Sequence, residues 1–258
     1  MIILVDIGNT YIKVSTSLDC SIIDKTKTRE IKDFSSIKLP IFKDLDGVII
    51  SSVSKGKEHI YYEYFKEKYG IEPYIVSHDS KTNVIYNLKT EENELGSDLI
   101  ALMEGASLKS NSFITISLGT ATVFNVVKDL KYIGTAISPG ILTSLNGLID
   151  SASLIEDTNL DGNYDLLGRN TEEALRSGLF NGYTFLIEGF IKEIKNKYFD
   201  EDIPIYIFGG FSNIIENKLK EKVILDDTLL SKGLMNIYKL NRWLYEQVID
   251  YRWKQCHV

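Results

Sequence analysis

An aspartate, a glycine and two small polar side chains follow an apolar run at the very start of this chain. The run 2–5 predicts a buried strand, Asp6-Ile7-Gly8-Asn9-Thr10 comes next, and 12–17 predicts a second strand. Glycine lets backbone amides approach a phosphate, the Thr10 hydroxyl can donate to a phosphate oxygen, and Asp6 can hold Mg²⁺ through water. The segment therefore favours a phosphate-binding hairpin, although an ordinary Asn/Gly turn explains the same residues.

A second loop of the same kind lies in the middle of the chain. The run 113–118 predicts a strand, Gly119-Thr120-Ala121-Thr122 follows it, and 123–127 predicts the next strand. Near the C-terminus, Gly209-Gly210 follows another apolar run and leaves room for a flat base or ribose against the backbone. Two such hairpins and a late Gly-Gly resemble the acetate/sugar kinase–Hsp70–actin superfamily. This resemblance implies an α/β fold of two ribonuclease-H-like domains with ATP in the cleft between them.

Composition narrows the class of protein. The chain has 258 residues, of which 44% are hydrophobic and 25% charged, as in a soluble globular protein of one or two domains. A net charge of -7 without a basic run argues against nucleic-acid binding. Cys20 and Cys256 match no disulfide or metal pattern, and the histidines are dispersed. No run approaches the roughly 18 apolar residues of a membrane helix, so we expect a cytoplasmic protein.

Periodicity and turns predict where the chain divides. Strands and helices alternate up to a helix at 95–108, and the polar turn 109–112 follows it. We therefore expect an N-terminal domain at 1–112 and a C-terminal domain at 113–258. Apolar residues at helical spacing predict further helices at 171–198, capped by Asn170, and at about 229–248.

Several segments in a fixed order resemble one family of that superfamily, the type III pantothenate kinases. The match extends from residue 1 to about 241. Its segments are Asp6–Thr10 with Lys13, Glu94–Asp98 as the Gly-x-Asp-Arg motif, 119–122, 134–140, Asn170-Thr171 with Ser177-Gly178, and 230–234 continuing to Asn241.

The resemblance implies a homodimeric enzyme that phosphorylates pantothenate with Mg·ATP, the first committed step of coenzyme A synthesis. It implies Asp98 as the base that accepts the hydroxyl proton and Asp6 as the residue that helps to hold Mg²⁺. It also implies phosphate contacts from Gly8, Asn9, Thr10, Lys13, Gly119 and Thr120, adenosine contacts from Gly209 and Gly210, and pantothenate contacts from Tyr86, Gly96, Ser97, Asp98, Leu99 and Thr171.

Each of three assigned residues also has a purely structural explanation. Asp98 lies in the first turn of a predicted helix, where the helix dipole favours an acid. Thr171 lies where a helix N-cap is expected. Lys13 lies on a predicted strand, where a solvated lysine is equally consistent with the sequence.

Two positions depart from the family pattern. Leu99 stands where the motif has arginine, which removes a cation from the substrate side. Ser117 stands where the family has an aspartate that binds K⁺ or NH₄⁺, and Asn125 stands where a second acid often lies. These departures leave two alternatives open: a diverged paralogue with a binding or regulatory role, and a kinase of another small hydroxylated substrate.

Overall fold

The computed structural model describes residues 1–18, 21–28, 39, 41–54, 56–87, 95–152 and 165–246. The chain forms two compact units, unit 1 from Met1–Lys109 with Thr228–Val258 and unit 2 from Ser110–Asp227. The first boundary lies close to the expected one, but the expected C-terminal domain of 113–258 needs a correction. Helix α6 (Leu229–Glu246) belongs to unit 1 because it packs on α2 (Ser97–Ser107) and on β4 (Gly47–Ser52).

Unit 1 is built on a five-stranded sheet of order β3-β2-β1-β4-β5. Strand β1 (Ile2–Ile7) is antiparallel to β2 (Ile12–Leu18) and parallel to β4, which confirms the expected hairpin around Gly8. Strand β3 (Ser21–Thr28) was not expected, because its alternation is largely polar. Strand β5 (Tyr74–Ile75) is short and pairs in parallel with β4.

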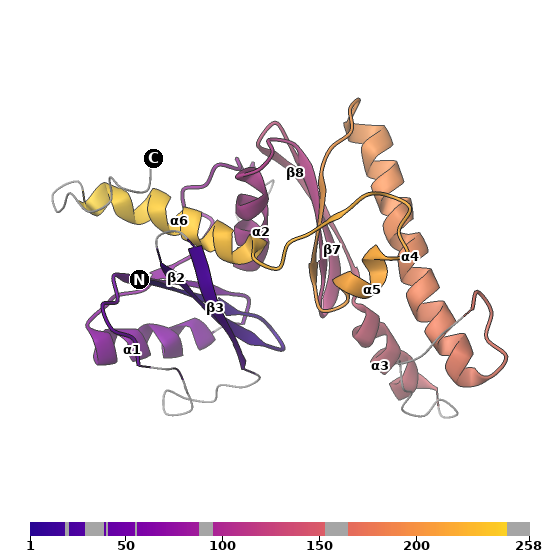
Figure 1. The fold of residues 1–258 in the computed structure, drawn as a ribbon, viewed down its shortest axis with the longest axis horizontal. Helices are drawn as coiled ribbons and strands as arrows, with labels where there is room; N and C mark the ends of the chain where they lie inside the picture. The colour runs from indigo at the N-terminus through magenta and orange to yellow at the C-terminus, as the bar shows by residue number, and fades with distance from the viewer. Residues whose placement is uncertain are drawn as a thin grey trace. The chain divides into compact units, whose positions relative to one another are not determined.

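The two faces of the unit 1 sheet differ in chemistry. One face is apolar, with Ile3, Val5 and Ile7 packed against aromatic residues of α1 (Lys57–Tyr69). Side chains alternate across a strand, so Asp6 lies on the opposite face. That face also carries Lys13, Ser15 and Ser51, and helices α2 and α6 pack over it. Figure 1 shows α1 and α6 on opposite sides of this sheet.

Helices α2 and α6 approach each other through glycines. A Cβ at Gly105 of α2 would lie 1.9 Å from the carbonyl oxygen of Leu229, and one at Gly233 of α6 would lie 1.7 Å from that of Ala101. Only glycine permits backbones to come this close. The crossing therefore fixes α2 from Ala101 to Gly105 and leaves its first turn at the edge of the sheet.

A buried carboxylate ties a third segment to these two helices. Glu104 of α2 is fully buried and accepts hydrogen bonds from the amides of Asn83 and Val84 and from Nδ2 of Asn236 on α6. Burial raises the pKa of Glu104, and these hydrogen bonds oppose the rise. Asn241 adds a second attachment, because its side chain bonds both the amide and the carbonyl of Lys81. The segment before Tyr86 is thus held by one buried carboxylate and by an exposed pair of hydrogen bonds to Asn241.

Unit 2 repeats the strand order of unit 1. Read from its other edge, its sheet runs β8-β7-β6-β9-β10, with the central strand antiparallel to one neighbour and parallel to the other, as in unit 1. The strands are β6 (Phe113–Leu118), β7 (Ala121–Lys128), β8 (Lys131–Pro139), β9 (Ile205–Gly209) and β10 (Ile224–Leu225). The repeated order confirms two related α/β domains.

Helices cover one face of the unit 2 sheet (Figure 1). Helix α4 (Thr171–Tyr198) has the expected bounds, and its Asn170 cap is confirmed, with Oδ1 accepting from the Glu173 amide at 2.9 Å. Its apolar side packs into the core of unit 2 with α3 (Ile141–Ser151), a helix that was not expected, and α5 (Ser212–Glu216). None of the helices in the described ranges combines the length and apolar character needed to cross a membrane.

Some expectations lie outside the described residues. These are the structure around Cys20 and Cys256, the first motif residue Glu94, and the last two residues of the helix expected to end at about 248.

The glycine crossing predicts an asymmetry among glycine-to-alanine substitutions. Gly105→Ala and Gly233→Ala should each destabilise the protein by about 1–3 kcal/mol, because the new methyl group overlaps backbone atoms. Gly147→Ala, in α3 with open space above it, should instead stabilise by about 0.5–1 kcal/mol. Calorimetric unfolding of the three variants measures this, and equal midpoints would contradict a close crossing.

Candidate functional site

The first glycine loop is a tight turn with an accessible tip. The Gly8 amide donates to the carbonyl of Tyr11 at 3.0 Å, and a Cβ at Gly8 would lie 2.9 Å from that oxygen. Asn9 and Thr10 are exposed at the tip. The turn therefore presents its polar groups beyond the end of β1, next to Asp6.

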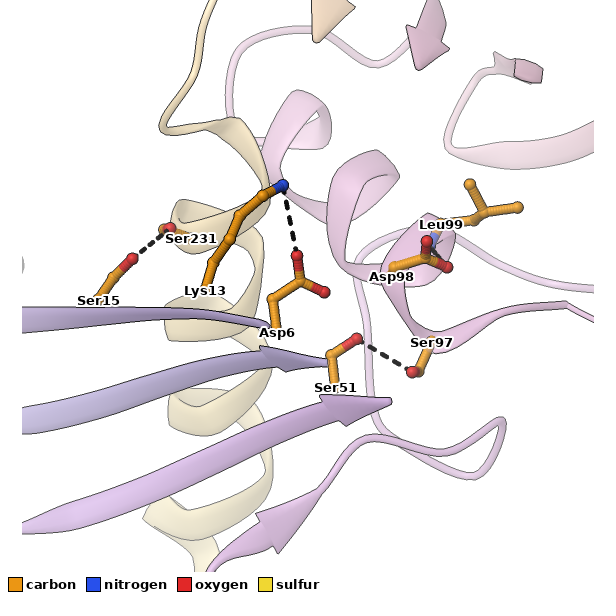
Figure 2. A network of polar contacts seen from close by, with 8 residues as sticks. All are labelled: Asp6, Lys13, Ser15, Ser51, Ser97, Asp98, Leu99 and Ser231. Carbon is orange, nitrogen blue, oxygen red and sulfur yellow. Dashed lines mark hydrogen bonds and ion pairs between the residues drawn. The ribbon is translucent and has the colours of Figure 1, made fainter. Parts of the chain in front are cut away.

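Asp6 is a buried carboxylate at the end of β1. Its Oδ2 lies 3.6 Å from Nζ of Lys13, the residue opposite it on β2 (Figure 2). Its Oδ1 is buried and has no hydrogen-bond partner among the residues that the structure describes. Burial raises the pKa of Asp6 to about 6, and the charge of Asp98 adds to the rise while Lys13 opposes it. An unpartnered buried carboxylate oxygen is a natural acceptor for water bound to a cation.

Asp98 provides the second carboxylate of the cluster. It lies in the first turn of α2, and its Oδ1 accepts a hydrogen bond from the amide of Leu99 at 2.8 Å. Burial raises the pKa of Asp98, while backbone hydrogen bonds and the charge of Lys13 oppose the rise. Both carboxylates thus respond to the same lysine. The structure brings Asp6, Lys13 and Asp98 together, as Figure 2 shows.

A glycine before the helix makes room for the Asp98 carboxylate. A Cβ at Gly96 would lie 2.6 Å from Oδ1 of Asp98 and 3.2 Å from Cγ1 of Val53. Gly96 also starts the helix, because its carbonyl accepts from the amides of Leu99 and Ile100. The glycine of this motif therefore has a steric role at the carboxylate.

The other residues expected to contact pantothenate lie in different surroundings. Ser97 is buried, and its hydroxyl is bonded to residues at the end of β4. Leu99 is half-buried on α2, and the hydroxyl of Tyr86 donates to the carbonyl of Ile100 at 3.5 Å. Thr171 belongs to unit 2, where it is the exposed first residue of α4, and the cap is Asn170 instead.

In unit 2 the remaining two glycine elements lie side by side. Gly119 and Thr120 follow β6, while Gly209 ends β9, its parallel neighbour, and Gly210 comes directly after it. The Gly210 amide donates to the carbonyl of Leu118 at 3.1 Å. Gly209 has a φ of 122°, and a Cβ there would lie 2.3 Å from that carbonyl oxygen, so both the conformation and the space require glycine.

The start of α3 supports the Gly119-Thr120 turn, which sequence reasoning did not anticipate. The carbonyl of Thr120 accepts from the Gly140 amide at 2.9 Å and from the Thr143 hydroxyl at 2.6 Å. A Cβ at Gly140 would lie 2.1 Å from the carbonyl oxygen of Gly119. The glycine after Pro139 was the available signal, because it follows a strand and precedes an apolar run.

Comparisons with known proteins identify the family of this chain. A sequence model of the type III pantothenate kinases matches residues 2–193. The type III pantothenate kinase of Pelagibacter ubique is 33% identical over 91% of this chain and 97% of its own. That of Acholeplasma laidlawii is 30% identical over 93% of this chain and 99% of its own. This chain belongs to the type III pantothenate kinase family.

Solved structures bear on the fold of this family member. A Campylobacter jejuni protein assigned to the Baf family of transcriptional activators has a TM-score of 0.60 at 19% identity, with 93% of this chain and 98% of the other covered. The ethanolamine utilization protein EutJ of Carboxydothermus hydrogenoformans has a TM-score of 0.50 at 13% identity, covering 93% and 89%. Together with the two matching sheets, these likenesses confirm the expected fold class.

In this pantothenate kinase family member, the position of the second acid is occupied by a neutral network. Asn125 is fully buried and donates to the hydroxyl of Thr115 at 3.0 Å, while its Oδ1 accepts from Thr135 at 2.8 Å. Tyr132 extends the network to Thr135 at 2.7 Å. Ser117 is half-buried two residues beyond Thr115 on β6. Within the described ranges, no group of three or more acidic, histidine or cysteine side chains is arranged to hold a metal ion.

The raised pKa of Asp6 predicts a specific pH dependence of stability. The folded state holds this proton more tightly than the unfolded state, so its contribution is greatest below pH 4 and is lost as the pH rises to about 6. Asp6→Asn should therefore stabilise the metal-free protein at pH 7.5, by at most about 3 kcal/mol. It should also reduce the loss of stability between pH 4.5 and 7, and denaturant unfolding measures both effects.

Asp202 offers a control for this measurement. It is exposed on the surface and paired with Lys195, which lowers the pKa of Asp202. Asp202→Asn should leave the fall between pH 4.5 and 7 in place. If Asp6→Asn had the same pH profile as the unmodified protein, the buried carboxylate would not be the source.

Proposed function

We propose that this protein transfers the γ-phosphoryl group of ATP to the hydroxyl of pantothenate, forming 4'-phosphopantothenate in the first committed step of coenzyme A biosynthesis. Family membership supports the substrate. The observation that carries the chemistry is the gathering of Asp6, Lys13 and Asp98 at one edge of unit 1. Phosphoryl transfer requires chiefly positioning and neutralisation of charge, and this cluster offers both.

Asp98 acts as the base in this proposal. Its raised pKa makes it a better proton acceptor than an exposed aspartate. It orients the pantothenate hydroxyl and takes its proton as the oxygen attacks the γ-phosphorus. Lys13 stabilises the negative charge that accumulates near the two carboxylates. The backbone amide of Asn9 and the hydroxyl of Thr10 contact the phosphate oxygens, whereas the amide of Gly8, expected to do so as well, is already bonded to the Tyr11 carbonyl and closes the turn.

The residues also fit a magnesium ion that accompanies ATP. The buried Oδ1 of Asp6 has no hydrogen-bond partner within the described part of the chain, so it can accept from water in the ion's hydration shell. When bound, Mg²⁺ neutralises charge on the transferring phosphoryl group. Asp6 remains ionised beside such a charge, although its pKa is raised to about 6 without it.

Unit 2 contributes its own contacts to this proposal. Gly119 and Thr120 are exposed at the end of β6 and contact phosphates, while Gly209 and Gly210 border the adenosine. Their backbones are rigidly held by Gly140, Thr143 and the carbonyl of Leu118. In unit 1, pantothenate contacts come from Tyr86, Gly96 and Leu99.

Leu99 favours a second candidate function. A leucine cannot pair with the carboxylate of pantothenate, whereas the arginine of the family motif can. A kinase of this family that acts on another small hydroxylated substrate would tolerate the change. The rates of phosphorylation of pantothenate and of its uncharged amide, pantothenamide, separate the two cases. A site that binds the carboxylate phosphorylates pantothenate faster.

The proposed activity uses cytoplasmic ATP and Mg²⁺, so we place the protein in the cytoplasm. Its partners are small molecules together with a second copy of the chain. Support for the dimer comes from the exposed side of α4, where Gly178, Gly182 and Gly189 have open space above them and Phe185 is 57% exposed. Glycine inside a helix costs about 0.5–1 kcal/mol, which the close approach of a second helix offsets.

Sedimentation tests the dimer. We expect a stable dimer at micromolar concentration, and Phe185→Asp should shift the equilibrium towards monomer, because it places a charge on the proposed contact. Leu167→Asp changes another exposed hydrophobic residue, outside α4, and should leave the dimer intact. A monomer at every concentration would contradict the proposal.

Loss of the base should slow the reaction. We expect Asp98→Asn to lower kcat for phosphopantothenate formation by about 10²–10⁴, the range for a general base, while Mg·ATP binding persists. Asp6→Ala should abolish turnover and weaken Mg·ATP binding. Mass spectrometry of the product and calorimetric titration of Mg·ATP measure the two effects. Formation of phosphopantothenate at the unmodified rate by Asp98→Asn would return Asp98 to its helix-terminus role.

The neutral residues Ser117 and Asn125 predict weak dependence on monovalent cations. A hydroxyl and an already bonded amide supply little charge to compensate for dehydration of K⁺ or NH₄⁺. Activity should therefore be similar in Na⁺, K⁺ and choline buffers, and Ser117→Asp should introduce a dependence on K⁺. Strong activation of the unmodified protein by millimolar K⁺ would show that another group supplies the charge.

A further inference from the structure

We propose that Ser97 is a positioning residue, whose hydroxyl joins the start of α2 to the end of β4 and thereby holds the Asp98 carboxylate beside Asp6. The inference rests on the proposed function and deepens it. It assigns the variable position of the Gly-x-Asp motif a role distinct from contact with the acceptor.

The Ser97 hydroxyl has three hydrogen-bond partners at one strand end. Its Oγ lies 3.0 Å from Oγ of Ser51, 2.9 Å from the Ser52 amide nitrogen and 2.9 Å from the Ser52 carbonyl oxygen. Ser51 is fully buried and Ser97 nearly so. Figure 2 shows the Ser51–Ser97 contact bridging β4 and the first turn of α2.

The hydrogen-bond directions follow from the number of protons. A hydroxyl has one proton and two acceptor sites. The Ser52 carbonyl can only accept, so Ser97 donates its proton there. Ser97 must then accept from the Ser52 amide, and the remaining contact requires Ser51 to donate. The one donor and both acceptor sites of the Ser97 hydroxyl are therefore occupied within unit 1. This hydroxyl has no hydrogen-bonding site left for a substrate.

The register of the sheet connects this contact to the other carboxylate. Asp6 lies opposite Ser51, and Ile7 lies opposite Ser52, on the parallel strands β1 and β4. The strand end that Ser97 holds is therefore the neighbour of the strand end that carries Asp6. Asp98 follows Ser97 directly. The path from Asp6 to Asp98 consists of one strand pairing, one hydroxyl contact and one peptide link.

The other attachments of α2 lie farther along the helix. Ala101 and Gly105 contact α6, the Ile100 carbonyl accepts from Tyr86, and Glu104 holds the segment at 83–84. These contacts hold α2 from its second turn onward and constrain its first turn only through the helix itself. Because a displacement of about 1 Å can cost 10²-fold in rate, a separate contact at the first turn has a direct effect on catalysis.

The same sheet face supplies a matched control. Ser15 of β2 and Ser231 of α6 form another buried hydroxyl pair, with 3.2 Å between their Oγ atoms. Ser231→Ala removes a buried serine hydroxyl between the same sheet and a helix, but α2 is not part of that pair. A comparison of Ser97→Ala with Ser231→Ala therefore separates positioning of Asp98 from general loss of stability.

A double-mutant cycle tests the proposal. Ser97→Ala should lower kcat about 10–100-fold with little change in KM for ATP, whereas Ser231→Ala should lower the unfolding midpoint comparably and leave kcat within about twofold. In the Asp98→Asn background, Ser97→Ala should cause no further loss of kcat, because it acts through Asp98. An equal loss in both backgrounds, or a raised KM for pantothenate at unchanged kcat, would overturn the positioning role.

A structural readout separates this proposal from the proposed function. If the unmodified protein fails to phosphorylate pantothenate, the proposed function fails, and crystal structures of the variants still decide the role of Ser97. The Asp98 carboxylate should be displaced relative to Asp6 in Ser97→Ala and should keep its place in Ser231→Ala. An undisplaced carboxylate in Ser97→Ala would overturn the positioning role.

Discussion

The rest of unit 1 depends on holding two carboxylates out of water beside one lysine. Burial raises the pKa of both Asp6 and Asp98, and Lys13 opposes the rise in each. Such an arrangement costs stability, because charged groups lose hydration that one ammonium only partly replaces. The cost is consistent with a site that binds a cation and transfers protons. The surrounding contacts serve to keep the three groups in place against their tendency to separate.

Close backbone contacts supply that rigidity in both units. In unit 1, Gly105 and Gly233 let α2 and α6 cross tightly, and Gly96 leaves space for the Asp98 carboxylate. In unit 2, Gly140 and Gly209 bring α3 and β9 against the loop that follows β6. Each contact excludes even a methyl group, so the loops that carry function have few alternative positions. The two units use the same strand order and the same means to present polar turns at strand ends.

The predictable features were those encoded within a few residues. The hairpin at Gly8, the Asn170 cap and the bounds of α4 follow from local pattern, and the structure confirms them. Strand β3 was missed because an edge strand with a polar sequence lacks an apolar signal. Helix α6 was assigned to the wrong domain because its partner, α2, lies far away in the sequence. The role of Ser97 depends on a strand end about 45 residues away, as local pattern cannot show.

By itself the sequence determined the family, the two phosphate-type loops and the candidate base, since these depend on residue types at short, fixed spacing. It also identified the departures at Leu99 and Ser117. Only the tertiary structure decided that Asp6, Lys13 and Asp98 share one environment, that Asn125 is engaged in a neutral network, and that the Ser97 hydroxyl is fully used. These properties arise from burial and from contacts between distant segments, and both are set by the packing of helices on the sheets.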